Sequence, residues 1–119
     1  MSQLLLYSSD KGSGNALHRL LNNHNFNLTL LQKTEELVEK IRFGQADVVV
    51  LDLNSISCLY SELRIFFEMA EDIPVVILTP YDLCAQEIKN IPQNELCHFL
   101  SKPISTTQLE KLLTELISL

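Results

Sequence analysis

Short apolar runs alternate with segments of helical periodicity along the whole chain. Two runs rich in β-branched residues, Asp47–Leu53 and Pro74–Thr79, show almost no alternation of apolar and polar positions. Continuous apolar strands are typical of parallel sheets whose two faces are both covered by helices. Two further strands are expected at Leu4–Tyr7 and Leu96–Leu100. In Phe26–Leu31 apolar residues alternate with polar ones, which predicts a strand at the edge of the sheet.

Each expected strand is followed by a segment in which apolar residues recur at helical spacing. These segments are Asn15–Asn23, Thr34–Phe43, Leu59–Ala70, Asp82–Asn90 and a last helix that opens at Ser105. Thr34 is a candidate N-cap, and Gly44 is expected to end that helix. Ser105 and Gln108 have the spacing of a capping box. Five βα units joined by right-handed crossovers predict an α/β fold, a doubly wound (βα)5 sandwich of three layers.

Polar residues stand where four of the expected strands end. They are Ser8-Ser9-Asp10, Asp52, Thr79 and Lys102. The carboxyl ends of parallel strands meet at one edge of the sheet, and open α/β sheets bind their ligands there. A carboxylate, a hydroxyl and an ammonium group at this edge suit a phosphoryl group, one to accept it and two to hold it.

Composition limits the classes of function. The chain has 119 residues, of which 46% are hydrophobic and 20% charged, so a single domain over residues 1–119 is expected. The net charge of −6 argues against direct contact with nucleic acid. The three cysteines, Cys58, Cys84 and Cys97, lack zinc spacing and are expected to be reduced. No signal peptide or membrane span is recognised, and a cytoplasmic location is expected.

The glycine-containing loop Lys11–Asn15 follows the first strand, where a phosphate cradle would lie. It matches neither the dinucleotide-binding pattern nor the nucleotide P-loop, and it is interpreted as a flexible turn. A flavodoxin-type enzyme or ligand-binding domain is one alternative for such a fold. It is disfavoured because no loop is rich in the hydroxyls and glycines that a flavin phosphate requires.

Three stretches resemble the receiver domain of two-component response regulators, and the likeness extends over essentially the whole chain. Val48–Leu53 resembles the strand that carries the phosphoacceptor Asp52, and Val76–Pro80 resembles the strand that ends in the switch hydroxyl, Thr79. Phe99–Pro103 resembles the aromatic–x–x–Lys–Pro signature of the fifth strand. The resemblance implies a flavodoxin-like, five-stranded parallel sheet of order 2-1-3-4-5.

The resemblance also implies a function. Asp52 would accept a phosphoryl group from a histidine kinase or histidine phosphotransfer protein and switch a partner or an attached output domain. Thr79 and Lys102 would bind the phosphate, Phe99 would be the switch aromatic, and Pro103 would be structural. A homodimer is a further expectation, through the face formed by the expected helix Asp82–Asn90, the strand Leu96–Leu100 and the helix that opens at Ser105. Such a domain is not a stand-alone enzyme.

The chain departs from the family at the metal site. Ser8 and Ser9 stand where the family has two adjacent acids that organise a divalent cation. Mg²⁺ would then depend on Asp52, the Asn54 carbonyl and Asp10, which either supplies one acid or caps the following helix. Fewer acids predict weak Mg²⁺ binding and poor phosphorylation. The alternative function is therefore a pseudo-receiver that acts as a protein-interaction or dimerisation module.

Overall fold

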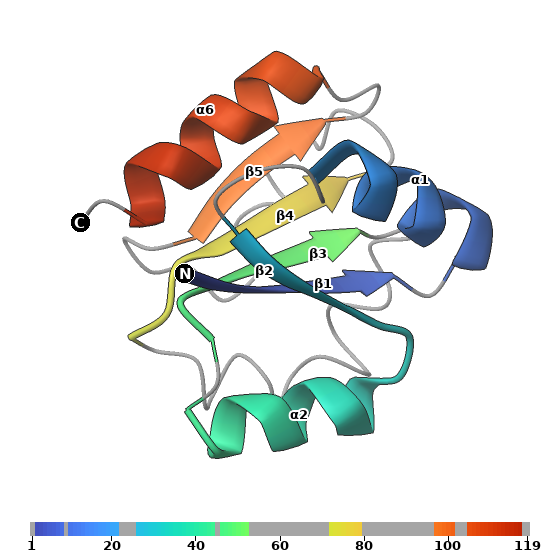
Figure 1. Cartoon of the computed structure of the whole chain (residues 1–119), viewed down its shortest axis with the longest axis vertical. Coiled ribbons are helices and arrows are strands. Elements are labelled where there is room, and N and C mark those ends of the chain that lie inside the picture. The colour runs from blue at the N-terminus through green and yellow to red at the C-terminus, as the bar shows by residue number, and fades with distance from the viewer. Residues whose placement is uncertain are drawn as a thin grey trace, which may run out of the picture.

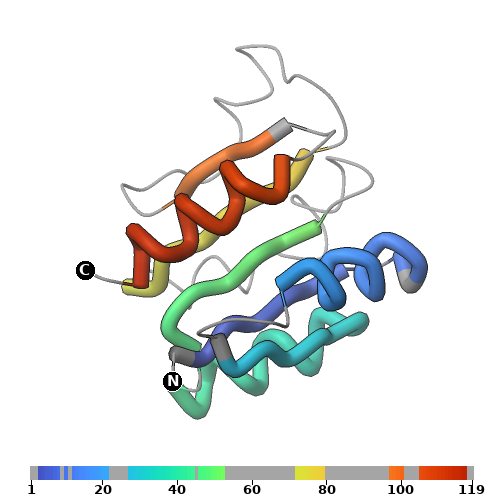
Figure 2. The backbone as a smooth tube through the Cα atoms, turned by 45° about the horizontal axis from the view of Figure 1, so that its top comes forward, coloured from blue at the N-terminus to red at the C-terminus, as the bar shows by residue number. Residues whose placement is uncertain are grey.

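The fold is built on one five-stranded parallel sheet. The computed structural model describes residues 2–8, 10–21, 26–44, 46–52, 72–79, 97–101 and 105–117. The strands are β1 (Ser2–Ser8), β2 (Phe26–Leu31), β3 (Val48–Asp52), β4 (Val75–Thr79) and β5 (Cys97–Ser101). Their order is β2-β1-β3-β4-β5, and Figure 2 shows them side by side in that order. The predicted order 2-1-3-4-5 and the edge position of Phe26–Leu31 are confirmed.

Helices cover both faces of the sheet. α1 (Lys11–Leu21) and α6 (Thr106–Ile117) lie on one side, and α2 (Thr34–Arg42) lies on the other (Figure 1). The three-layer α/β sandwich is thereby confirmed. The expected helices Leu59–Ala70 and Asp82–Asn90 fall outside the described residues. In the described ranges, no helix combines the length and apolar character needed to cross a bilayer.

Two hydrophobic cores flank the sheet because successive strand residues point to opposite faces. The α2 face buries Leu5, Tyr7, Leu31, Leu37, Ile41, Val49, Leu51, Val75 and Ile77. The α1 and α6 face buries Leu4, Leu6, Leu17, Leu21, Val48, Val50, Val76, Leu78, Leu109, Leu113 and Leu116. Every residue of β3 and β4 is buried, as their continuous apolar sequences predicted.

Two helix starts differ from the predictions. α1 begins at Lys11 rather than Asn15, so the interpretation of Lys11–Asn15 as a flexible turn is wrong: this segment is the first turn of the helix. Thr34 is the first residue of α2 and not its cap. The N-cap position belongs to Lys33, whose side chain makes no capping hydrogen bond. Glu35 and Glu36 lie in the first turn of α2, where their negative charges stabilise the helix by interacting with the positive end of its dipole.

Two other helix boundaries follow the sequence signals. The Ser105 hydroxyl accepts a hydrogen bond from the backbone N–H of Gln108 at 3.3 Å, which confirms Ser105 as the cap of α6. Gly44 follows α2 with a φ of +67°, and its N–H donates to the carbonyl of Ile41 at 3.0 Å. Glycine adopts this left-handed conformation without the Cβ clash that other residues meet, so it ends the helix.

Candidate functional site

Asp52 is the last residue of β3 and has an exposed fraction of 0%. It pairs in register with Ser8, the last residue of β1. Val50 lies two residues before Asp52, and Leu6 lies two residues before Ser8. Both Val50 and Leu6 face α1 and α6. Because strand side chains alternate between the two faces, Asp52 and Ser8 both point to the α1 side. The carboxyl ends of these neighbouring central strands therefore bring one carboxylate and one hydroxyl together.

The Ser8 hydroxyl contacts this carboxylate directly. Its Oγ lies 2.8 Å from Asp52 Oδ2 and 2.9 Å from the backbone oxygen of Asp10. Both of these atoms are acceptors, whereas a serine hydroxyl has a single proton. Ser8 therefore shares one proton between the carboxylate and the chain at the start of α1. This ties the end of β1 to both β3 and the helix.

A second hydroxyl reaches the same carboxylate oxygen from α1. Ser13 Oγ donates to Asp52 Oδ2 at 2.6 Å. Ser13 occupies the first turn of the helix, which Asp10 caps: Asp10 Oδ1 accepts from the Gly12 N–H at 3.0 Å, and its carbonyl accepts from the Gly14 N–H at 2.8 Å. These are the side-chain and backbone bonds of an N-cap residue. The helix-capping alternative for Asp10 is thus the one that the structure contains.

Gly14 allows α1 to lie close enough for this contact. A Cβ atom built on Gly14 would lie 3.0 Å from the Cβ and 3.3 Å from the Oγ of Ser8, and 3.3 Å from Leu30 Cδ1. A side chain here would push the first turn of α1 away from β1. The sequence therefore positions Ser13 through a capping residue, Asp10, and a close-packed glycine.

Thr79 lies on β4, the neighbour of β3, and Phe99 lies on β5, the edge strand beyond β4. Thr79 ends β4 one residue beyond Leu78, the register partner of Asp52, and is 1% exposed. Its hydroxyl donates to the carbonyl of Leu100 on β5 at 3.4 Å. Phe99 is half-buried and packs on the α2 side of the sheet. The edge predicted for Asp52 and Thr79 thus exists, with the two residues at the ends of adjacent strands.

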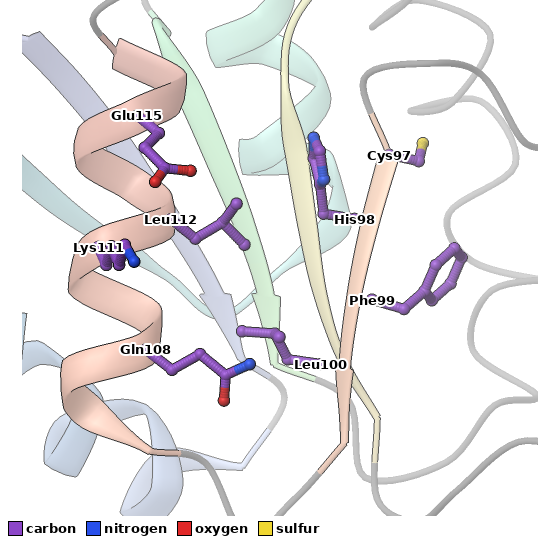
Figure 3. Close-up of a pocket in the computed structure, with 8 residues that line it drawn as sticks. All are labelled: Cys97, His98, Phe99, Leu100, Gln108, Lys111, Leu112 and Glu115. Carbon is purple, nitrogen blue, oxygen red and sulfur yellow. The ribbon is translucent and has the colours of Figure 1, made fainter.

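A groove of about 500 Å³ lies between β5 and α6 (Figure 3). His98 and Leu100 of β5 face it, and Gln108, Leu112 and Glu115 of α6 line its other side. In the same view the side chains of Cys97 and Phe99 point away from α6, on the opposite side of β5. The groove therefore combines apolar and charged groups on the β5 and α6 part of the predicted contact face.

Comparisons with known proteins find the same fold in solved receiver domains. Neither the protein-family models nor the curated proteins give a match. A response regulator receiver protein from Sinorhizobium medicae superposes with a TM-score of 0.76 at 20% identity, covering 98% of this chain and 94% of that one. The receiver domain of a Francisella response regulator gives a TM-score of 0.75 at 21% identity, with 99% and 98% covered. The chain has the receiver-domain fold.

A third receiver domain bears on the metal question. The receiver domain of a sensor histidine kinase from Pseudomonas aeruginosa gives a TM-score of 0.77 at 19% identity, over 99% of this chain and 98% of that one. It was crystallised with a magnesium ion coordinated in its active-site cleft. At such identities the three likenesses concern the fold, so a cation at Asp52 depends on the residues of this chain.

Those residues do not fit a Mg²⁺ site of that kind. Mg²⁺ takes octahedral oxygen ligands, gives up its waters reluctantly and is held through carboxylates. Asp52 is fully buried, its Oδ2 accepts two hydroxyls, and Asp10 uses Oδ1 as a helix cap. Within the described ranges no three His, Cys, Asp or Glu residues cluster as metal ligands. A hydrated ion would have to displace the Ser8 and Ser13 hydroxyls to reach Oδ2.

The remaining predicted site residues lie outside the described part of the chain. These are Ser9, Asn54, Lys102 and Pro103, so their roles stay predictions. One residue of the described site, Ser13, was missed. The signal that points to it is Asp10, which is a strong N-cap residue and starts the helix at Lys11. Gly12 and Gly14 obscured that signal, because glycine disfavours helix interiors.

Proposed function

We propose that the chain is a receiver-type domain of a two-component phosphorelay in which Asp52 accepts a phosphoryl group. The phosphoryl donor is a histidine kinase or a histidine phosphotransfer protein. The observation that carries the proposal is the place of Asp52. Its buried carboxylate stands at the carboxyl end of the central strand β3, in a fold superposable on receiver domains. Burying a carboxylate costs stability that hydrogen bonds from neutral hydroxyls offset only in part, and this favours a functional reason for its position.

In this function an Asp52 oxygen attacks the phosphorus atom, and the bond from phosphorus to the donor nitrogen breaks. Thr79, one strand away, would donate its hydroxyl to a phosphate oxygen after transfer. Lys102 would supply the positive charge, and Phe99 would couple the change to the surface of β5 and α6. That surface, with its groove, is the proposed contact face for a partner or a second copy of the chain. This domain would make no direct contact with nucleic acid.

The second candidate is a pseudo-receiver that signals through protein contacts without efficient phosphotransfer. It is favoured by the surroundings of Asp52, which is fully buried and accepts hydrogen bonds from two neutral hydroxyls. Phosphoryl transfer needs the charge that develops on the phosphate to be neutralised. With Ser8 in place of an acid, the described site lacks the second carboxylate that would recruit a cation for this purpose.

One experiment separates the two candidates. The purified chain is incubated with acetyl phosphate or phosphoramidate, with and without Mg²⁺, and examined by phosphate-affinity gel and intact-mass spectrometry. Stoichiometric addition of one phosphoryl group that is absent from Asp52→Asn establishes the first candidate. No addition under any of these conditions, from a chain that remains folded, establishes the second. Modification that persists in Asp52→Asn would show that Asp52 is not the acceptor.

A further inference from the structure

We propose that Ser8 and Ser13 form a hydroxyl clamp that takes the place of a divalent cation at Asp52. The clamp consists of the two hydroxyl groups that meet Asp52 Oδ2 at 2.8 Å and 2.6 Å. One comes from the end of β1 and the other from the first turn of α1. The inference rests on the proposed function only in taking Asp52 as the functional centre, and it holds whether or not Asp52 is phosphorylated.

The clamp is held by the frame of the fold. The register of β1 against β3 places Ser8 beside Asp52, and the bond from Ser8 Oγ to the Asp10 carbonyl links it to the helix start. Asp10 fixes the first residues of α1, and Gly14 lets that turn approach β1. Because the start of α1 is fixed in this way, the Ser13 hydroxyl loses little conformational freedom when it binds Asp52. Ser13 is therefore a positioning residue for the Asp52 carboxylate.

The chemistry of the clamp differs from that of a cation. Two hydroxyls satisfy a buried carboxylate oxygen by hydrogen bonding but add no negative charge that would attract Mg²⁺. Asp10, the one described acid close in sequence to Ser8, directs Oδ1 to the Gly12 N–H instead. A metal ion that binds Oδ2 would have to displace these two hydroxyls. The carboxylate is consequently held at Oδ2 without metal, and we expect divalent cations to bind the site too weakly to saturate it at millimolar concentration.

A cation titration tests this directly. The whole chain is titrated with Mg²⁺, and separately with Mn²⁺, by calorimetry and by amide chemical shifts, beside Ser8→Asp, Ser13→Asp and Asp52→Asn. The wild-type chain is expected to show no saturable binding at millimolar cation. A second carboxylate beside Asp52 is expected to raise the affinity by about tenfold or more. Ser13→Asp lies in the half-exposed first turn of α1 and remains informative where the buried Ser8→Asp does not fold.

The outcomes of the titration are decisive for the clamp. A gain in either folded variant, with none in the wild type, supports it. Saturable binding by the wild-type chain that Asp52→Asn removes overturns it. Folded variants that gain nothing also overturn it, because the hydroxyls would then not be what keeps the cation away. Each of these results is independent of phosphorylation, so failure of the proposed function is recognised separately.

The positioning role of Ser13 has its own readout. With ¹³C-labelled aspartate, the side-chain carboxyl resonance of Asp52 reports its hydrogen-bond donors and is identified by its absence from Asp52→Asn. Ser13→Ala is expected to shift this resonance, and Ser13→Thr to restore it, with the amide spectrum otherwise unchanged. Thr107→Ala, which removes an exposed hydroxyl on α6, is the control. A resonance that is the same in Ser13→Ala and wild type overturns the role of Ser13.

Discussion

Gly14 and Ser8 pack so closely that a Cβ atom on Gly14 would lie 3.0 Å from the Cβ of Ser8. We expect Gly14→Ala to destabilise the chain by about 1–3 kcal/mol, because the added methyl group must separate α1 from β1. The gain in helix propensity from alanine, about 1 kcal/mol, offsets only part of this cost. Urea unfolding followed by circular dichroism measures the change. The separation should also weaken the contact between Ser13 and Asp52.

Gly12 provides a matched control in the same helical turn. A Cβ on Gly12 would meet only Asp10 Oδ1, at an ordinary 3.6 Å, and Gly12 is exposed. Gly12→Ala should therefore stabilise the chain by roughly 0.5–1 kcal/mol through helix propensity alone. Equal effects of Gly12→Ala and Gly14→Ala would contradict the close approach of α1 to β1.

The strands were predictable because their pattern is local. β3 and β4 are buried on both faces, so their sequences carry continuous apolar residues, and β2 at the edge alternates. Such local patterns do not predict the order of the strands in the sheet. That order followed from the resemblance to receiver domains, whose signature residues include Asp52 and Thr79.

The site was predictable only in part, since its contacts join residues distant in sequence. Asp52 and Ser8 could be placed together because parallel strands end at one edge. The contact of Ser13 with Asp52 spans 39 positions and depends on where α1 begins and how closely it packs. Both properties depend on glycines, which lower helix propensity while permitting the approach at Gly14. The local sequence of Lys11–Asn15 therefore predicts a flexible turn, whereas in the fold this segment is the start of α1.

Asp10 should behave as a helix cap. We expect Asp10→Ala to lower the free energy of unfolding by about 1 kcal/mol, because the Gly12 N–H loses its side-chain acceptor. Asp10→Asn keeps an acceptor oxygen and should cost much less. Urea unfolding of both variants, each with and without Mg²⁺, measures this. Loss of a Mg²⁺-dependent stabilisation in both variants would instead identify Asp10 as a metal ligand.

Gly44 should be limited by backbone conformation alone. Its φ is +67°, and a Cβ atom there would meet nothing within 4 Å. Gly44→Ala is expected to destabilise the chain by about 1–2 kcal/mol, the cost of a left-handed conformation for a residue with a Cβ. Gly44→Asn should lose less, because asparagine tolerates this region. If thermal unfolding shows the two variants to be equally destabilised, conformational strain is not the cause.

Ser8 and Ser13 should be energetically coupled through Asp52 Oδ2. Ser8→Ala, at a fully buried position, is expected to cost about 1–3 kcal/mol, and the part-buried Ser13→Ala about 1 kcal/mol. Either single variant leaves Oδ2 with one of its two hydroxyls, whereas the double variant removes both. The double variant should therefore cost more than the sum, with a coupling of about 0.5 kcal/mol or more in a double-mutant cycle. Repeating the cycle in an Asp52→Ala background removes the shared acceptor, so the coupling should vanish there. Additive effects in the wild-type background, or a coupling that survives Asp52→Ala, would show that the two hydroxyls do not act on the same carboxylate.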